Sequence, residues 1–354
     1  MPYDPFVRGP HPVGVRTLYT NDPARDDRPL TIEVWYPATD AYRNQDLAET
    51  TRDHYELLPV FPPVPQDAVR EATPRSERHP LVLFSHGFGS HRRQSTFLCT
   101  HLASRGYVVA GIDHAGNTMH DLLQSTIAVR GGAPPPDGEA LLRASIIDRP
   151  LDVRFMLAEL DRGALGPHGP QIDGARIGMC GHSFGGWTTL IVAAREPRIA
   201  AIVPLAPAGG TTPLGGHLLR DALDFRWPHP IPTLVLAAER DSILPLPGMR
   251  ELFTRIPDPK TLSVLGNADH MHFCDRAETV HEMFRAMPPP GGFAAVAKTT
   301  PPFGALCPAE PAYAWVRGLS AAHLDAHLRG DEGAAALLRS GLPKALAVRG
   351  IAAG

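Results

Sequence analysis

A serine stands between two glycines in the sequence Gly-His-Ser-Phe-Gly at residues 181–185. An apolar segment at 175–180 precedes this pentapeptide, and residues 186–194 after it are apolar enough for a buried helix. Strand, sharp turn and helix form the context in which a G-x-S-x-G turn exposes a nucleophilic hydroxyl. We therefore predict that Ser183 is a nucleophile held in a strained backbone conformation at a helix N-terminus. The alternative is a glycine-rich turn without catalysis.

A serine hydroxyl is a weak nucleophile, so it needs a general base and a group that orients this base. Asp241 follows the apolar segment 234–238, and His270 follows the segment 262–266. Because ligands of parallel sheets bind where the strands end, we expect both residues near Ser183. The order serine, acid, histidine is typical of such sites. The sequence therefore predicts Asp241 as the acid and His270 as the base, with a helix cap or an ion pair as the alternative role for Asp241.

Other residues compete for these two roles. Asp269 and Asp224 are the rival acids, although Asp269 is too close in sequence to His270 to reach its ring easily. His272 is the rival base. His270, His272 and Cys274 also resemble an H-x-H metal cluster, but no further set of acidic residues or histidines completes it. We therefore expect no metal and no cofactor, and we expect structural roles for His86, His91, His114 and His182.

Acyl transfer also requires two N–H donors for the oxyanion. The residue after the nucleophile, Phe184, is expected to supply one of them. The other is expected in the loop 86–89, which follows a continuous apolar run, and we assign it to the N–H of Phe88. The side chains of the two phenylalanines are candidates for the walls of an acyl pocket, whereas Trp187 and Cys180 are expected in the core.

Apolar segments and helical patterns alternate along the chain. Strands are expected at 13–19, 30–36, 81–87, 107–114, 175–180, 199–205, 233–238 and 261–265, and helices at 95–105, from 148, at 186–194, 248–255 and 276–287. The first two strands alternate apolar and polar residues, which predicts an antiparallel pair at a sheet edge. The rest predicts an α/β fold with a doubly wound, mostly parallel sheet of about eight strands and flanking helices.

We predict that residues 1–354 form a single domain. Three stretches depart from the alternating pattern: loop insertions are expected at 38–79 and 115–148, and an irregular stretch followed by helices at 312–328 and 332–339 is expected within 288–354. The numbers of prolines, 38, and glycines, 33, are both high, and the prolines fall in clusters between apolar runs, which indicates long ordered loops rather than disorder.

Composition excludes several classes of protein. A formal charge of −3 gives no reason to expect a nucleic-acid partner, and no apolar run is long enough to span a membrane. The start of the chain lacks the features of a secretory signal, so we expect a cytoplasmic protein. Its four cysteines lack zinc spacing and are expected to be free thiols; Cys274 with Cys307 is the pairing to consider in an exported protein.

Three segments carry a resemblance to a known family: residues 84–89 (FSHGFG), 111–114 (GIDH) and 181–186 (GHSFGG). They resemble the α/β-hydrolase superfamily, in particular platelet-activating-factor acetylhydrolases and serine-type dienelactone-hydrolase-like esterases. Cutinase-type polyester hydrolases are similar more distantly. The resemblance covers about residues 13–287, and residues 324–331 look like the closing helix of the dienelactone-hydrolase-like group. It implies the α/β-hydrolase fold and hydrolysis of carboxylic esters through an acyl-enzyme, without a cofactor.

The chain departs from this family pattern at two points. Plasma acetylhydrolases carry their acid after the strand that follows the nucleophile helix, where this chain has Leu205, Ala206 and Pro207. The acid is then Asp241, which argues against a narrow acetylhydrolase specificity. Dienelactone hydrolases proper carry cysteine at the nucleophile position, so a dienelactone substrate is not implied for Ser183.

We therefore expect a serine esterase for small-molecule esters of short to medium acyl chain. An amidase or peptidase, or a polyester or lipid hydrolase, would use the same three residues. A catalytically silent binding protein on a hydrolase scaffold is the alternative from a different class.

Overall fold

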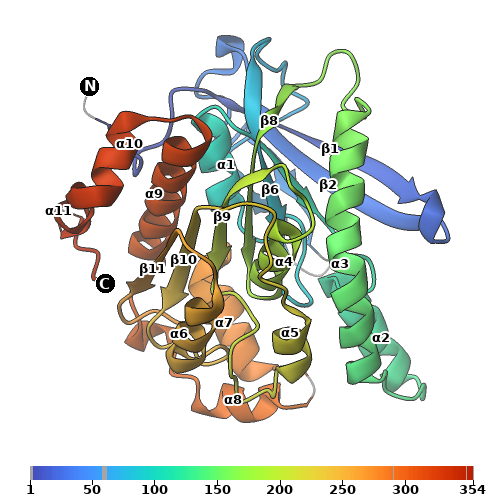
Figure 1. Ribbon diagram of the computed structural model, residues 1–354. Coiled ribbons are helices and arrows are strands. Elements are labelled where there is room, and N and C mark those ends of the chain that lie inside the picture. Colours follow the sequence, from blue (N-terminus) through green and yellow to red (C-terminus); the bar gives the residue numbers. More distant parts are fainter. Residues whose placement is uncertain (1–2, 58–61, 290, 348, 354) are drawn as a thin grey trace. The chain divides into compact units, whose positions relative to one another are not determined.

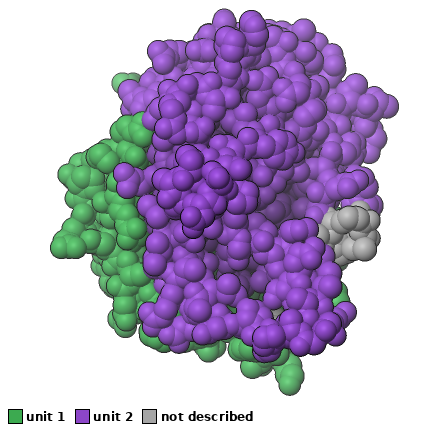
Figure 2. Space-filling view, turned by 90° about the vertical axis from the view of Figure 1, so that its right-hand side faces the viewer, with its two compact units in different colours: residues 1–8, 176–354 green, residues 9–175 purple. Residues whose placement is uncertain are grey.

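The computed structural model describes residues 3–57, 62–289, 291–347 and 349–353. The chain divides into two compact units (Figure 2). The C-terminal unit consists of Met1–Arg8 and Arg176–Gly354, and the N-terminal unit consists of Gly9–Ala175. Each unit has its own strands and helices, and the single domain over 1–354 stays a prediction.

Four parallel strands dominate the C-terminal unit (Figure 1). They pair in the order β11-β10-β9-β8, with bounds Gln171–His182 for β8, Ile199–Leu205 for β9, Thr233–Ala238 for β10 and Lys260–Leu265 for β11. The first residues of β8, 171–175, still belong to the N-terminal unit. The register aligns His182 with Leu205 and Ala238 with Leu265. The four carboxyl ends therefore lie at one edge, where the predicted catalytic residues follow the strands.

Helices cover this sheet as the sequence predicts. Their bounds are Phe184–Ala193 for α4, Leu246–Arg255 for α6, Ala277–Ala286 for α7 and Ala309–Leu328 for α9. Helices α4 and α9 contact β9, and α6 contacts β10. Trp187 of α4 and Trp315 of α9 are fully buried, which confirms the expected core position of Trp187. Burying two indole rings of this size contributes strongly to the stability of the core.

The stretch from 288 to 354 is more helical than expected. Besides α9, it contains α8 (Phe293–Thr299), α10 (Glu332–Ala336), a π-helical segment at Leu337–Gly341 and α11 (Leu342–Ala347). The predicted irregular stretch up to residue 311 is therefore wrong in part, because α8 interrupts it and α9 begins at Ala309. The short helix α5 (His217–Ala222) lies between β9 and β10 in the sequence.

The N-terminal unit pairs five strands in the order β6-β7-β2-β1-β5. Their bounds are Arg78–Ser85 for β6, Val108–Ile112 for β7, Arg28–Pro37 for β2, Val13–Asp22 for β1 and Val69–Arg70 for β5. The predicted antiparallel pair is confirmed, because β1 pairs with β2 from Val13 opposite Pro37 to Asp22 opposite Arg28. Helix α1 (Thr96–Ser104) packs on β2 and β7.

The expected insertion at 38–79 contains little regular structure among its described residues. It holds β5 and the short pair of β3 (His54–Tyr55) with β4 (Val64–Pro65); residues 58–61 lie outside the described part.

The loop expected at 115–148 is wrong, because this stretch is largely helical. It contains α2 (Met119–Arg130) and the beginning of α3 (Gly138–Asp161). Thr118 and Asp121 form a reciprocal capping box at the start of α2, and the carboxylate of Asp137 caps α3. The predicted helix start at 148 is also wrong, since Pro150 lies inside α3 rather than in its first turn.

Among the described residues, no helix is both long enough and apolar enough to cross a membrane. Cys99, Cys180, Cys274 and Cys307 are all free, as expected. Cys180 is fully buried on β8, which confirms its predicted core position.

Candidate active site

The turn between β8 and α4 has the geometry of a nucleophile elbow. Ser183 has φ of 59° and ψ of −116°, a conformation that L residues rarely adopt. Its N–H donates to the carbonyl of Leu205 at 2.9 Å, and its own carbonyl accepts from the N–H groups of Trp187 and Ala208 at 3.0 Å each. These three hydrogen bonds hold the strained residue from both sides. The half-buried side chain sits at the N-cap of α4.

Close backbone packing explains the glycines around the serine. A Cβ atom on Gly181 would lie 2.3 Å from the carbonyl oxygen of Gly185, and one on Gly186 would lie 2.8 Å from Cα of Pro207. Neither distance is compatible with a side chain, because the neighbouring atoms belong to the backbone. The elbow therefore requires glycine at both positions.

The predicted acid and base are in direct contact. Nδ1 of His270 lies 2.8 Å from Oδ2 of Asp241, and both side chains are almost fully buried. The other carboxylate oxygen of Asp241 accepts from the N–H groups of Ile243 at 3.0 Å and Leu244 at 2.7 Å. Asp241 is thus oriented by the backbone after β10 and fixes the tautomer of His270. The proton on Nδ1 leaves Nε2 as the nitrogen that can act as a base.

The electrostatic surroundings of His270 favour its protonated form. Burial lowers its pKa, but the charge of Asp241, the hydrogen bond to it and the charge of Asp269 together outweigh burial. The pKa of His270 is therefore raised above its ordinary value of 6.5. An imidazole stabilised as imidazolium is suited to take a proton from a nucleophile and return it later.

Asp269, the first rival acid, has a different role in the structure. Its Oδ1 accepts from the N–H of His270 at 2.5 Å, and from the N–H and the hydroxyl of Ser242 at 3.1 and 3.0 Å. Ser242 follows Asp241 directly in the chain. Asp269 therefore ties the loop of the acid to the turn of the base. The second rival, Asp224, pairs with Arg226 at 2.8 Å at the surface.

His272, the rival base, faces other partners. Its Nε2 lies 2.9 Å from the carbonyl oxygen of Cys307, and its ring stacks on Phe303 with centroids 4.8 Å apart. Burial lowers its pKa. The two rings thus differ in their partners, since Nδ1 of His270 contacts the carboxylate of Asp241 and Nδ1 of His272 contacts the backbone of Asp269. Among the residues that the structure describes, no group of three or more His, Cys, Asp or Glu side chains is arranged to hold a metal ion.

His182 has a larger part in the site than the sequence indicates. Its ring centroid lies 4.5 Å from that of His270, and the ring also stacks on Phe273 at 5.4 Å. Burial and the nearby charge of His270 lower the pKa of His182 well below its ordinary value, so the ring is neutral. The residue before Ser183 therefore packs directly on the predicted base. The sequence signal for this contact is the position of His182 directly before the predicted nucleophile.

The two predicted oxyanion donors lie in different units. Phe184 is the first residue of α4, and its side chain is buried and packs on Trp187 with centroids 5.3 Å apart. Phe88 belongs to the N-terminal unit, in the loop after β6, and its side chain is exposed. The structure brings Asp241 and His270 together beside the Ser183 turn, and the pairing of Phe88 with this group stays a prediction.

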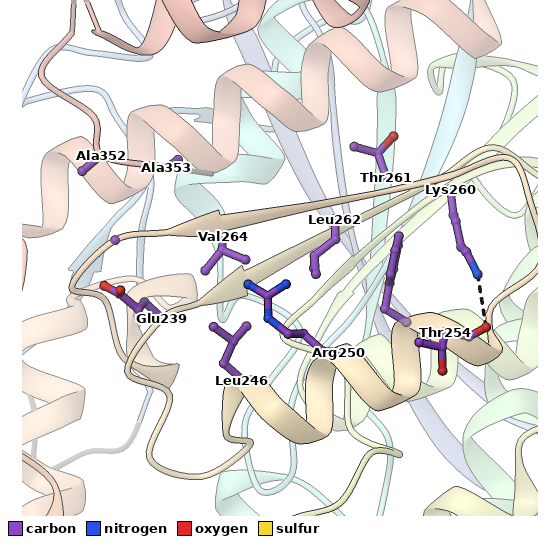
Figure 3. A pocket seen from close by; sticks show the side chains of 12 residues that line it. Glu239, Leu246, Arg250, Thr254, Lys260, Thr261, Leu262, Val264, Ala352 and Ala353 are labelled. Carbon is purple, nitrogen blue, oxygen red and sulfur yellow. Dashed lines mark hydrogen bonds between the residues drawn. The ribbon is translucent and has the colours of Figure 1, made fainter.

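A pocket of about 640 Å³ lies elsewhere in the C-terminal unit. Apolar and basic side chains of α6 and β11 line it, among them Leu246, Arg250, Lys260 and Leu262, and Figure 3 shows them on the two elements. Ser183, Asp241 and His270 are not among its lining residues. This pocket is therefore separate from the predicted catalytic group.

Comparison with known families gives two matches. Residues 11–121 match the family described as platelet-activating factor acetylhydrolase, isoform II, and residues 143–285 match the family described as PET hydrolase-like. The second match contains Ser183, Asp241 and His270.

Individual relatives agree with these families. The bis(hydroxyethyl) terephthalate hydrolase of Streptomyces coelicolor is 31% identical over 49% of this chain and 43% of its own length. Cutinase est1 of Thermobifida alba is 29% identical over 53% of this chain and 52% of its own. The platelet-activating factor acetylhydrolase of Gallus gallus is 30% identical over 31% of this chain and 30% of its own. The chain thus spans about half the length of the first two relatives, or less.

A solved structure is similar over almost the whole chain. The ferulic acid esterase from Streptomyces cinnamoneus superposes with a TM-score of 0.58 at 26% sequence identity, covering 90% of this chain and 91% of its own. The predicted fold of mostly parallel strands with flanking helices is thereby confirmed as the α/β-hydrolase type.

Proposed function

The chain belongs to the α/β-hydrolase superfamily and is similar to its esterases, and from this premise we propose that it is a serine hydrolase of carboxylic esters. The observation that carries the proposal is the buried Asp241–His270 hydrogen bond at the sheet edge where the strained Ser183 turn lies. The proposed substrates are small-molecule esters of short to medium acyl chain.

Each residue has a defined role in the proposed reaction. Oγ of Ser183 attacks the ester carbonyl while Nε2 of His270 takes the serine proton, and Asp241 stabilises the imidazolium that forms. His270 then gives the proton to the departing alcohol, which leaves an acyl-enzyme. Nε2 of His270 then takes a proton from water, whose oxygen attacks the acyl carbon. The bond from this carbon to Oγ of Ser183 breaks, His270 returns the proton to Oγ, and the acid is released.

The N–H groups of Phe184 and Phe88 are the proposed oxyanion donors. This assignment requires the two units to act as the single catalytic domain predicted for residues 1–354. It is supported by the solved esterase, which is similar to 90% of the chain rather than to one unit.

Hydrolysis of p-nitrophenyl esters from acetate to palmitate, by the wild type and Ser183→Ala side by side, tests the proposal. We expect turnover that depends on the serine, with Ser183→Ala losing several orders of magnitude while remaining folded by circular dichroism. A steep fall beyond butyrate would define a short-chain esterase. Full activity in the alanine variant would refute the assignment.

A polyester hydrolase is the second candidate, favoured by the PET hydrolase-like match over the residues of the predicted triad. Two relatives are named for esters of aromatic acids, terephthalic and ferulic. Bis(hydroxyethyl) terephthalate and methyl ferulate therefore belong in the substrate panel. Preference for the terephthalate ester over p-nitrophenyl butyrate, together with release of products from a polyester film, would favour this candidate.

The other two alternatives have direct tests. An amidase or peptidase would cleave an amide at a rate comparable with the matched ester, whereas we expect the ester alone to be turned over rapidly. A silent scaffold would fail to react with a fluorophosphonate, whereas an activated Ser183 should be labelled and Ser183→Ala should not.

We also propose a cytoplasmic location and no nucleic-acid partner. The four free thiols are typical of a reducing compartment, and the formal charge of −3 does not favour binding to a polyanion. Cell fractionation followed by immunoblotting tests the location.

A further inference from the structure

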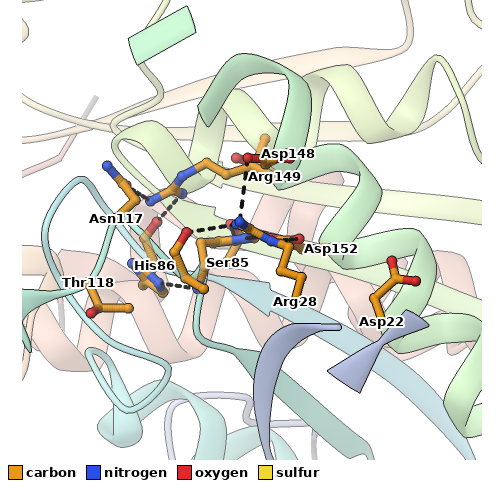
Figure 4. Close-up of polar contacts among 12 residues, drawn as sticks. Asp22, Arg28, Ser85, His86, Asn117, Thr118, Asp148, Arg149 and Asp152 are labelled. Carbon is orange, nitrogen blue, oxygen red and sulfur yellow. Dashed lines mark hydrogen bonds and ion pairs between the residues drawn. The ribbon is translucent and has the colours of Figure 1, made fainter. Parts of the chain in front are cut away.

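The guanidinium of Arg149 is fully buried in the N-terminal unit, against the loop that follows β6. Its Nη1 donates to the carbonyl of His86 at 2.7 Å, and its Nη2 donates to the carbonyl of Gly87 at 3.1 Å and to Oδ1 of Asn117 at 2.5 Å. Figure 4 shows Arg149 reaching from α3 between His86 and Asn117. A buried cation is costly, so its use to bind loop carbonyls calls for an explanation.

The carbonyl of Gly87 belongs to the same peptide group as the N–H of Phe88. In a planar trans peptide these two groups point in opposite directions. Whatever fixes the carbonyl oxygen of Gly87 therefore also fixes the direction of the Phe88 N–H. Nδ1 of His86 lies 2.7 Å from the same carbonyl oxygen, and the N–H of Gly87 donates to Oε1 of Gln94 at 2.6 Å. Both peptide groups around Gly87 are thus anchored.

We propose that Arg149 is a positioning residue that holds the Gly87–Phe88 peptide with its N–H directed at the oxyanion. This inference rests on the proposed esterase function, in which Phe88 is a donor. A peptide flip would turn the carbonyl of Gly87 toward the oxyanion and would leave a buried guanidinium without that acceptor. The cation at the carbonyl oxygen also polarises the peptide, which makes its N–H a stronger donor.

Arg149 could instead serve only to neutralise the charge of Asp152, but the contacts of Asp152 do not favour this role. The carboxylate of Asp152 already forms ion pairs with the guanidinium groups of Arg25 at 2.7 Å and Arg28 at 2.9 Å. It also contacts Nδ1 of His114 at 2.9 Å. Its charge is therefore compensated by two arginines other than Arg149. Burial lowers the pKa of Arg149 to about 9, and the charge of Asp152 offsets part of this effect. Arg149 is thus still a cation at neutral pH.

The same helix holds the rest of the loop through a buried relay. His114 bridges Asp152 and Ser85, with its Nε2 2.9 Å from the hydroxyl oxygen of Ser85. The N–H of His114 in turn donates to Nε2 of His86 at 3.1 Å. This chain of Ser85, His114 and Asp152 resembles a catalytic triad in its contacts, but all three side chains are fully buried. It serves to fix the end of β6, from which the oxyanion loop departs.

The test compares Arg149→Met, Arg149→Lys and Asn117→Ala with the wild type in steady-state ester hydrolysis. We expect Arg149→Met to lower kcat by about 10²- to 10³-fold with KM almost unchanged, as for loss of one oxyanion donor. Arg149→Lys should recover part of this loss, because an ammonium can still donate to the Gly87 carbonyl. Asn117→Ala should give a smaller fall in kcat in the same direction and serves if Arg149→Met does not fold.

Arg28→Met is the matched control, since Arg28 pairs with the same Asp152 but donates to the carbonyl of Ala115 rather than to the oxyanion loop. It should keep the wild-type kcat, because Arg25 still pairs with Asp152 and the contacts of Asp152 with His114 and of His114 with Ser85 do not involve Arg28. A crystal structure of Arg149→Lys or Asn117→Ala gives a second readout, in which we expect the Gly87–Phe88 peptide to be flipped or in two orientations.

Wild-type kcat in the Arg149 and Asn117 variants, or a loss of kcat equal to that in Arg28→Met, would overturn the inference while leaving the esterase function intact. An unmoved peptide in the variant structures would overturn it as well. A wild type without turnover that depends on Ser183 would instead overturn the proposed function, and with it the catalytic part of this inference.

Discussion

The ring of His270 binds the carboxylate of Asp241 at 2.8 Å, whereas Asp269, its neighbour in the sequence, binds the backbone N–H of His270. Two acidic residues thus approach one histidine from different sides. Asp241 determines the tautomer of the ring, and Asp269 determines the conformation of the turn that carries it. The two carboxylates can therefore be distinguished by isosteric substitution.

Asp241→Asn should lower kcat/KM by about 10⁴-fold, because an amide would favour the wrong tautomer of His270. Asp269→Asn keeps an oxygen that can accept from the N–H groups of His270 and Ser242, so it should retain at least about a tenth of the activity. Steady-state kinetics on one p-nitrophenyl ester measures both. The reverse order of the two losses would assign the acid to Asp269.

The pH profile should report the raised pKa of His270. Since the base acts in its neutral form, kcat/KM should rise with pH along an acidic limb whose midpoint lies above 6.5. Asp269→Asn removes a charge that raises this pKa, so its midpoint should move to lower pH and the variant should keep more of its activity in acid. Ser242→Ala removes a hydrogen bond to Asp269 but no charge, and its midpoint should stay in place. A shift to higher pH in Asp269→Asn would contradict this account.

The strained backbone conformation of Ser183 should lower the free energy of unfolding of the protein. With φ of 59° and ψ of −116°, the residue lies in a region that glycine alone adopts readily. Ser183→Gly should therefore unfold with a free energy about 1 kcal/mol higher than that of Ser183→Ala, while neither variant is active. Equilibrium denaturation in urea measures the difference. A lower stability of Ser183→Gly than of Ser183→Ala would contradict this account.

In the C-terminal unit, the positions of the candidate catalytic residues and of the strands that carry them are largely predictable from the sequence. Ser183, Asp241 and His270 each follow a short apolar run, and in a parallel sheet this pattern alone places residues at one edge. The predicted bounds of β9 and β10 agree with the observed ones, because buried parallel strands consist of nearly uninterrupted runs of apolar residues.

The sequence was less informative where a contact depends on distant partners. Pro150 indicates a helix start by its local preference, yet it lies within α3, whose start is set by the cap at Asp137. Arg149 carries no sign of its role in the linear sequence, because its two carbonyl acceptors lie more than sixty residues away and its third acceptor, Oδ1 of Asn117, lies 32 residues away. His182 was assigned a structural role, although it packs on the ring of His270.

Glu33 on β2 should govern the stability of the N-terminal unit in acid. Its fully buried carboxylate lies within 3.2 Å of Arg70, Arg92 and Arg93. Burial raises its pKa, but the three arginine charges outweigh burial, so the pKa of Glu33 is lowered from 4.5. A carboxylate with a lowered pKa in the folded state stabilises the protein above the pKa of the unfolded chain, and this contribution is lost as the pH falls through the folded value.

Glu33→Gln should therefore lower the free energy of unfolding at pH 7 by about 3 kcal/mol, because it leaves buried arginine charges partly unpaired. The difference from the wild type should shrink as the pH falls below about 4.5, where Glu33 of the unfolded chain begins to take up a proton, and should be lost below the lowered pKa of the folded protein. Glu77→Gln, which breaks an exposed pair with Arg75, is the control and should differ little from the wild type across the pH series, because solvent screens this pair. Urea denaturation at a series of pH values measures all three proteins. A difference between Glu33→Gln and the wild type that grows toward acid would show that the pKa of Glu33 is raised, not lowered, in the folded protein.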